Sequence, residues 1–196
     1  CECLRDCAEY NVPIMVAHAF IGFEEHSPNE IGVRNFGRVV DEAERLGVKL
    51  ALENTEGIEY LSRLFEAFSD RECVGFCWDT GHEMCYNWSE DVVGRFGQDG
   101  KLFATHLNDN LGIRDFEGKI TWIDDLHLLP FDGIADWKGI AERLDRAGFD
   151  GTMTFELNTK SKPGRHENDK YDKMDIEQYV TEVYIRACRL AAMRKR

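Results

Sequence analysis

The amino-acid sequence predicts an α/β protein with a parallel sheet. Short apolar runs alternate five times with segments of helical periodicity, which is the pattern of successive βα units joined by right-handed crossovers. The runs are almost continuously apolar, as expected for strands that are covered on both faces. Five such units fit either a doubly wound sheet or part of a closed barrel. The position of the polar residues favours the barrel.

The elements follow from apolar periodicity and from residues that begin or end helices. Residues 1–10 have the pattern of the end of a helix. Gly47 and Gly148 follow amphipathic segments and are expected to end them, and Asp136 is placed to cap the helix before Gly148. We expect strands at residues 12–20, 48–53, 74–79, 102–107 and 152–157, and helices at residues 34–46, 58–68, 90–96, 137–147 and from about 174 to 196.

Composition indicates an ordinary globular protein and narrows its partners. The 196 residues are enough for one domain, and 43% hydrophobic with 31% charged residues is a common balance. The net charge of −13 disfavours a broad basic surface for nucleic acid. No apolar run reaches the roughly 18 residues of a membrane helix, and no signal peptide is visible. We therefore expect a cytoplasmic protein without a membrane partner.

The cysteines also favour a cytoplasmic protein. There are seven, an odd number, and they are scattered, which favours reduced thiols. The spacing of Cys1, Cys3 and Cys7 matches no usual zinc site. The chain begins with Cys1 rather than Met, so we expect a processed, trimmed or fragmentary chain.

Four of the expected strands end in an acid or an imidazole. Glu53 and Asp79 close two strands, and His106 and Glu156 lie near the ends of two more. A carboxylate at the end of an apolar strand is costly to bury unless it is paired, hydrogen-bonded or bound to a metal. One such residue is usually a capping group, but four on successive strands favour a shared site, because strand ends converge on one face of a parallel barrel.

The four side chains would form a site with oxygen and nitrogen ligands. Such a site suits one divalent ion, with Mn²⁺ as our first choice and Mg²⁺, Co²⁺ or Zn²⁺ as alternatives, and it includes no thiolate to favour a soft metal. Further polar residues follow the same strand ends or lie in the long loops 108–131 and 158–173, where α/β proteins often carry function. The candidates for substrate binding from this pattern are His18, His82, Asp109, Arg114 and His127.

Five motifs in order resemble a known family. The segments LALENTEG, CWDTGHE, ATHLNDN, HLLPFDGIADW and TFELN are similar to the xylose-isomerase-like TIM barrels, a superfamily of sugar isomerases and epimerases, dehydratases and endonuclease IV. The resemblance implies that Glu53, Asp79, His106 and Glu156 bind one divalent metal. It implies that Glu53 and Glu156 form the acid/base pair of an epimerase, that His82 contacts substrate, and that Glu59 matches a substrate-contacting carboxylate.

The family barrel has eight strands, and the five expected here resemble its fourth to eighth. We therefore expect residues 1–196 to be a single, N-terminally truncated domain of this type, an incomplete barrel that leaves apolar edges and helix faces exposed. A second copy could cover them in a homo-oligomer.

The expected function is a metal-dependent isomerase or epimerase that removes a proton next to the carbonyl of a sugar, sugar phosphate or keto acid. Three alternatives remain open. One is a dehydratase of the inosose or dehydroshikimate type on the same site. Another is an endonuclease IV-like zinc phosphodiesterase acting on abasic DNA, suggested by His82 and the Asp125-x-His127 pair. The third is a non-catalytic barrel fragment.

Overall fold

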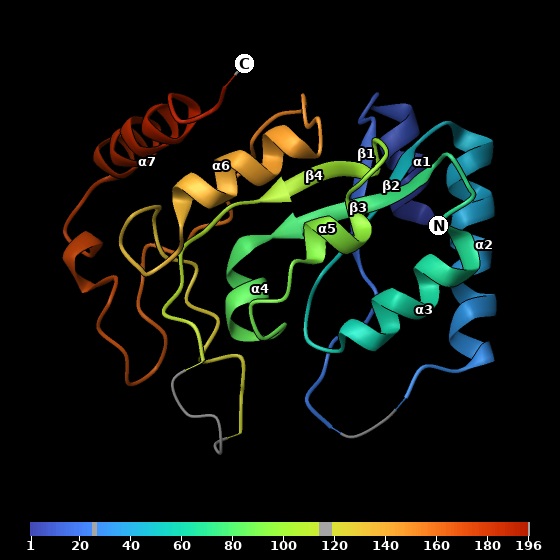
Figure 1. Cartoon of the computed structure of the whole chain (residues 1–196), viewed down its shortest axis with the longest axis horizontal. Helices are drawn as coiled ribbons and strands as arrows, with labels where there is room; N and C mark the ends of the chain where they lie inside the picture. Colours follow the sequence, from blue (N-terminus) through green and yellow to red (C-terminus); the bar gives the residue numbers. More distant parts are fainter. Residues whose placement is uncertain (25–26, 114–118, 196) are drawn as a thin grey trace.

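The computed structural model describes residues 1–24, 27–113 and 119–195. A parallel sheet with strand order β1-β2-β3-β4 forms its centre, and helices follow the strands (Figure 1). The strands are β1 (Ile14–His18), β2 (Lys49–Glu53), β3 (Val74–Asp79) and β4 (Leu102–His106). The helices are α1 (Glu2–Glu9), α2 (Glu30–Leu46), α3 (Ile58–Phe68), α4 (Thr80–Cys85), α5 (Val92–Phe96), α6 (Trp137–Arg146), the 3₁₀ helix η1 (Asp169–Tyr171) and α7 (Ile176–Ala191).

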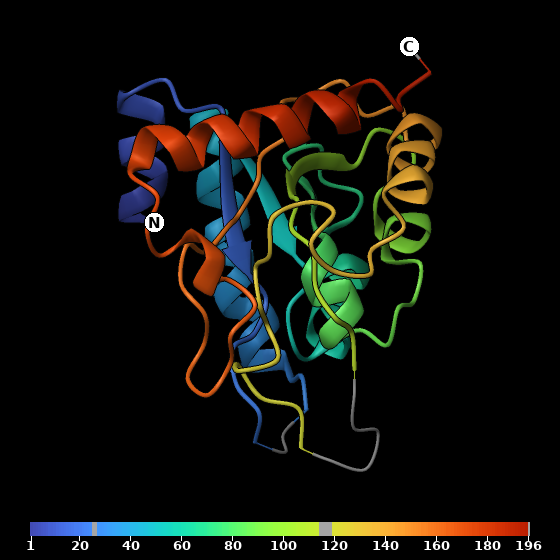
Figure 2. The ribbon, with the colours of Figure 1, turned by 90° about the vertical axis from the view of Figure 1, so that its left-hand side faces the viewer.

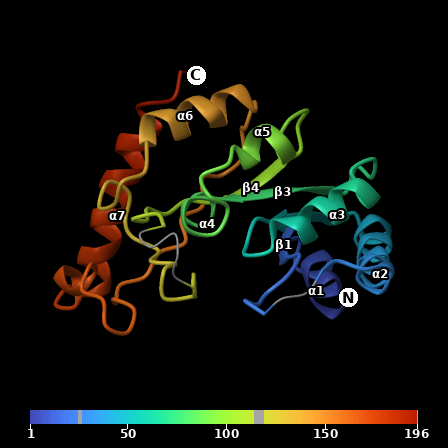
Figure 3. The same ribbon diagram turned by 60° about the horizontal axis from the view of Figure 1, so that its bottom comes forward.

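The helices lie in two groups around the sheet. Figure 3 shows α1, α2 and α3 near β1, and α6 and α7 beyond β4. The apolar faces of these helices and of the strands share one core, which includes Leu4 of α1, Phe76 of β3 and Leu144 of α6. Burial of this shared apolar surface is what holds the two groups of helices against the sheet.

Helix boundaries follow local capping. The side chain of Asn29 accepts hydrogen bonds from two backbone amides of α2, so this helix begins at Glu30, earlier than the sequence predicted. Gly47 ends α2 in the left-handed conformation (φ 68°), as predicted. The predicted cap of α6 is also confirmed, because the Asp136 side chain accepts from the Gly139 amide.

The predicted fifth strand is wrong in its extent. Residues 152–157 run beside β4 but form a single parallel bridge, between Phe155 and Leu107. The hydroxyl of Thr105 accepts from the Thr154 amide at 3.1 Å, so a side chain takes a bond that a longer ladder would make through the backbone. The Leu107 amide still donates to the Thr154 carbonyl, which keeps this segment parallel to β4.

The sheet is open, and an apolar helix face is exposed. In α7, Ile176, Val180 and Tyr184 are four residues apart and are each more than half exposed. This agrees with the expectation of uncovered helix faces. No helix within residues 1–24, 27–113 and 119–195 is long and apolar enough to cross a membrane.

The strand directions decide where functional side chains gather. In Figure 2, β1 points toward the end of the molecule that carries residues 108–113, 119–131 and 158–173. The register sets Glu53 beside His18 and Asp79 beside His106, so the last residues of the strands lie side by side. Active sites of parallel barrels lie at this end of the strands, so a functional site is expected here.

Candidate metal centre

The four predicted metal ligands converge in the structure. Glu53, Asp79 and His106 are the last residues of β2, β3 and β4, and Glu156 follows the residue that bridges Leu107, just after β4. One oxygen or nitrogen atom of each lies within 4.8 Å of the corresponding atoms of the others. This spacing is within reach of one ion after small side-chain movements, because metal–ligand distances for oxygen and nitrogen are about 2.0–2.2 Å.

Glu53 is the most unusual member of this group. Its side chain is only 1% exposed, and Oε1 lies 3.2 Å from His106 Nδ1 and 3.3 Å from His82 Nδ1. His18 Nε2 lies 3.3 Å from Oε2. Within the described part of the chain, neither oxygen has a hydrogen bond of acceptable geometry. Burial would raise the pKa of Glu53, but the three neighbouring imidazoles hold it well below its usual range. The result is a buried carboxylate that lacks good hydrogen-bond donors, as a metal ligand would.

Asp79 is held in place by its neighbours. The residue is fully buried, and its side chain caps α4 by accepting from the His82 amide at 2.7 Å. Asn108 Nδ2 lies 3.1 and 2.9 Å from its two oxygens. Burial raises the pKa of Asp79 to about 6. Hydrogen bonds of this kind orient a carboxylate and leave its remaining lone pairs for an ion.

Glu156, the fourth predicted ligand, is open to solvent. Glu156 Oε2 lies 2.8 Å from His106 Nδ1, and the Glu156 side chain is 48% exposed. Burial alone would lower the pKa of His106, but the carboxylates of Glu156 and Glu53 raise it to about 10. A molecule arriving from solvent would therefore meet Glu156 first and Glu53 last.

A second cluster lies next to the first. His82, Asp125 and His127 are all buried, and their ligand atoms lie within 4.8 Å of one another. Asp125 Oδ2 lies 2.7 Å from His127 Nε2 and 3.5 Å from His82 Nε2. The Nδ1 atoms contact the backbone carbonyls of Asn54 (2.9 Å) and Glu156 (3.0 Å). Donation from Nδ1 to a carbonyl leaves Nε2 as the ligating atom of a neutral imidazole.

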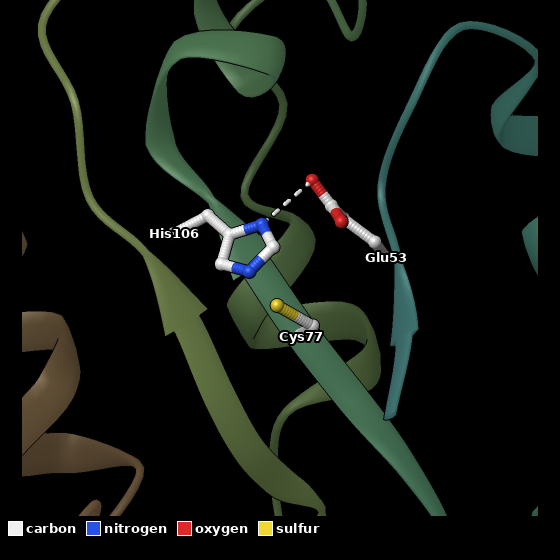
Figure 4. A group of neighbouring side chains, drawn as sticks. All are labelled: Glu53, Cys77 and His106. Carbon is white, nitrogen blue, oxygen red and sulfur yellow. Dashed lines mark ion pairs between the residues drawn. The ribbon is translucent and has the colours of Figure 1, made fainter. Parts of the chain in front are cut away.

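A thiol that the sequence analysis did not include lies beside two members of the first cluster. Cys77 Sγ and one ligand atom each of Glu53 and His106 lie within 4.8 Å of one another (Figure 4). Burial raises the pKa of this thiol well above its ordinary value. The sequence carried a signal for this placement: Cys77 is two residues before Asp79 in a strand, so both side chains lie on the same face of the sheet. The structure thus places a sulfur atom beside two of the four predicted ligands, which the sequence analysis did not anticipate.

Two of the predicted substrate-binding residues, Asp109 and Glu59, lie outside both clusters. Asp109 is fully buried and accepts hydrogen bonds from three backbone amides and from the Trp137 indole, all in the loop that follows it or in α6. These contacts give Asp109 a role in shaping the loop. Glu59 is exposed in the first turn of α3 and belongs to neither cluster. Arg114 lies outside the described residues.

Comparison with known proteins identifies the family. Residues 1–175 match the family described as xylose isomerase-like TIM barrel. The chain belongs to this family. The four-stranded parallel sheet and its helices are accordingly part of a TIM-barrel fold, as the sequence predicted.

Two curated proteins are similar over part of their length. An uncharacterised protein of Sinorhizobium fredii, y4fM, is 32% identical over 130 residues, which are 63% of this chain and 38% of that protein. A probable endonuclease 4 of Methanoculleus marisnigri is 28% identical over 131 residues, 56% of this chain and 46% of that protein. The chain thus spans less than half the length of these relatives.

Solved structures share the fold. A xylose isomerase domain protein of Planctomyces limnophilus superposes with a TM-score of 0.68 at 18% identity, over 97% of this chain and 64% of that one. The D-psicose 3-epimerase of Clostridium cellulolyticum H10, solved with D-tagatose, gives a TM-score of 0.63 at 16% identity, over 98% of this chain and 68% of that one. At these identities the likeness is one of fold.

Proposed function

We propose that this chain carries the metal centre of a divalent-metal-dependent isomerase or epimerase, acting on a sugar, sugar phosphate or related keto acid. The observation that carries the proposal is Glu53, a buried carboxylate with no hydrogen bond of acceptable geometry among the described residues, at the point where Asp79, His106 and Glu156 converge. These buried oxygens fit a cation, and three carboxylates with one imidazole suit Mn²⁺ first among divalent ions. The fold shared with an epimerase solved with D-tagatose supports a sugar substrate.

We assign the two proton transfers of the reaction to Glu156 and Glu53 according to the exposure of their side chains. A bound divalent ion would polarise the substrate carbonyl and lower the energy of removing the neighbouring proton. Glu156, which is half exposed, would take that proton from the carbon. Glu53, on the buried side, would take up a proton from solvent and return it to the adjacent carbon or to the opposite face, while Glu156 would release its proton to solvent, so the proton count stays balanced. General acid–base transfer of this kind contributes about 10²–10⁴-fold.

Two histidines complete the proposed site. His82 is fixed by its contact with the Asn54 carbonyl, and His18 is 41% exposed beside Glu53. We propose that both contact substrate hydroxyls. The net charge of −13 supports a small-molecule partner rather than nucleic acid. All seven cysteines are free, which supports a cytoplasmic site of action.

The test is elemental analysis of the purified protein, followed by assays on a panel of ketoses, keto acids and inososes. We expect about one divalent ion per chain in the wild type and loss of that ion in Glu156→Gln. Glu72→Gln is the matched control, because Glu72 is exposed and precedes β3, at the opposite end of the strands. A folded wild-type protein that binds no divalent ion after dialysis against Mn²⁺, Co²⁺ or Zn²⁺ would refute the proposal.

A second candidate function rests on the second cluster. His82, Asp125 and His127 would give a further ion three ligands, and a probable endonuclease 4 is among the similar proteins. Several zinc ions close together suit phosphodiester hydrolysis. Two or more zinc ions per chain, with one lost in His127→Ala and cleavage of DNA at an abasic site, would favour this function. A single ion that is retained in His127→Ala would favour the isomerase.

A further inference from the structure

Cys77 occupies a defined position beneath the proposed metal centre. In the strand register it stands directly beside Glu53, and Asp79, two residues further along β3, stands beside His106. Its side chain is completely buried. Figure 4 shows the thiol, the Glu53 carboxylate and the His106 imidazole gathered on one side of the sheet.

The atoms around this thiol have close charged neighbours, at 2.8–3.3 Å, but no hydrogen bond of acceptable geometry among the described residues. Both oxygens of Glu53 and Nδ1 of His106 are buried and have no hydrogen bond of acceptable geometry among the described residues. One ring nitrogen of His106, one oxygen of Glu53 and Sγ of Cys77 lie within 4.8 Å of one another. Three such ligands with a fourth position left open form a usual arrangement around a zinc ion.

We propose that the centre has a second, deeper metal position, formed by Cys77, Glu53 and His106, that takes soft ions such as Zn²⁺, Co²⁺ or Cd²⁺ through a thiolate. It rests on the function proposed above, because Glu53 and His106 also serve the oxygen-rich position with Asp79 and Glu156. When the ion binds, the S–H bond of Cys77 breaks, the proton goes to solvent, and a metal–sulfur bond forms. No oxidation or reduction takes place.

The two positions exclude each other because they share two ligands. Hard ions such as Mn²⁺ and Mg²⁺ prefer the carboxylates, and soft ions prefer the thiolate. The identity of the ion would therefore decide which position is filled. A soft ion in the deeper position would lie further from Glu156, the residue that meets solvent, and would support catalysis less well.

The experiment loads the metal-free protein with Co²⁺ alone and records its near-ultraviolet absorption, in which a cobalt–thiolate bond gives an intense charge-transfer band. The background carries Ser at Cys1, Cys3 and Cys188, since these thiols are exposed and could bind cobalt on their own. We expect the band in this background and its loss in Cys77→Ser. The band should persist in the matched control Cys85→Ser, because Cys85 is also buried but belongs to no metal-ligand cluster found among the described residues.

Competition titrations provide a second measurement. Cys77→Ser should weaken Cd²⁺ binding by about 10–100-fold or more and leave Mn²⁺ binding unchanged. If Cys77→Ser does not fold, Cys77→Ala and the spectrum of the parent background still decide the question. Bound cobalt without the band, or equal Cd²⁺ affinity in the variant, would overturn the thiolate position and leave the proposed function standing. Failure of every divalent ion to bind would overturn both.

Discussion

Replacing Arg143 with Met should destabilise the segment that carries two site residues. Arg143 donates to both oxygens of Glu83, each at 2.6 Å, and its guanidinium stacks 4.4 Å from the centre of the Trp78 ring. Trp78 and Glu83 directly flank the segment that begins with Asp79 and ends with His82. The substitution removes the charge and both hydrogen bonds while keeping most of the aliphatic contact.

The expected loss follows from the burial of the pair. Glu83 is 6% exposed, and the Arg143 side chain is 18% exposed. Removing one member of a buried ion pair costs about 3–5 kcal/mol, because the other charge is left unpaired. The partial exposure of Arg143 places the expected loss in the free energy of unfolding near about 3 kcal/mol. For a chain of this size, that corresponds to a fall of about 6–12 °C in Tm.

The dependence on pH gives an independent check. Burial raises the pKa of Glu83 even though Arg143 opposes the shift. Without Arg143 this pKa should rise further, so that the carboxyl can be neutral at mildly acidic pH. A raised folded-state pKa stabilises the fold at low pH, and that contribution is lost as the pH rises through it. The destabilisation by Arg143→Met should therefore be smaller at pH 5 than at pH 8.

Urea unfolding followed by circular dichroism measures these differences. Glu83→Gln combined with Arg143→Met removes both charges and should recover at least half of the loss. Arg38→Met serves as the matched control, because Arg38 is exposed, and should stay within about 0.5 kcal/mol of the wild type. The reasoning fails if Arg143→Met is as stable as this control, or if the double variant is less stable than Arg143→Met alone.

Two further outcomes are expected. Burial favours the neutral form of Asp132, but hydrogen bonds from its neighbours lower its pKa in the folded protein. The ionised carboxylate therefore stabilises the fold above the ordinary pKa of Asp, and this contribution is lost as the pH falls through the lower folded-state pKa. Below pH 4, the free energy of unfolding should therefore fall more steeply for the wild type than for Asp132→Asn in acid unfolding. Parallel curves of stability against pH for the two proteins would contradict this. In Gly81→Ala the added Cβ would overlap the Asn108 side chain, which orients Asp79, so metal affinity should fall about 10–100-fold. Calorimetric titration against Gly32→Ala, where a Cβ meets no neighbour, measures this, and equal affinities would count against the orienting role.

Local features of the chain were readable without the structure. The strand Val74–Asp79 and the helix Ile58–Phe68 have the boundaries that their apolar periodicity predicted. Helix α4 was missed because Asp79 serves both as the last strand residue and as the helix cap, so the strand pattern masks the start of the helix. Such patterns reflect contacts within a few residues, which propensity and periodicity describe.

The composition of the proposed centre depends on contacts that periodicity does not contain. The sequence determined that Glu53, Asp79, His106 and Glu156 end apolar segments, and the alternating pattern determined that these segments are parallel. Only the register of β2 against β3 placed the Cys77 thiol beside Glu53 and added sulfur to the set of possible ligands. Register is decided by side chains far apart in the chain that pack against each other, so the tertiary structure alone settles which atoms can share one ion.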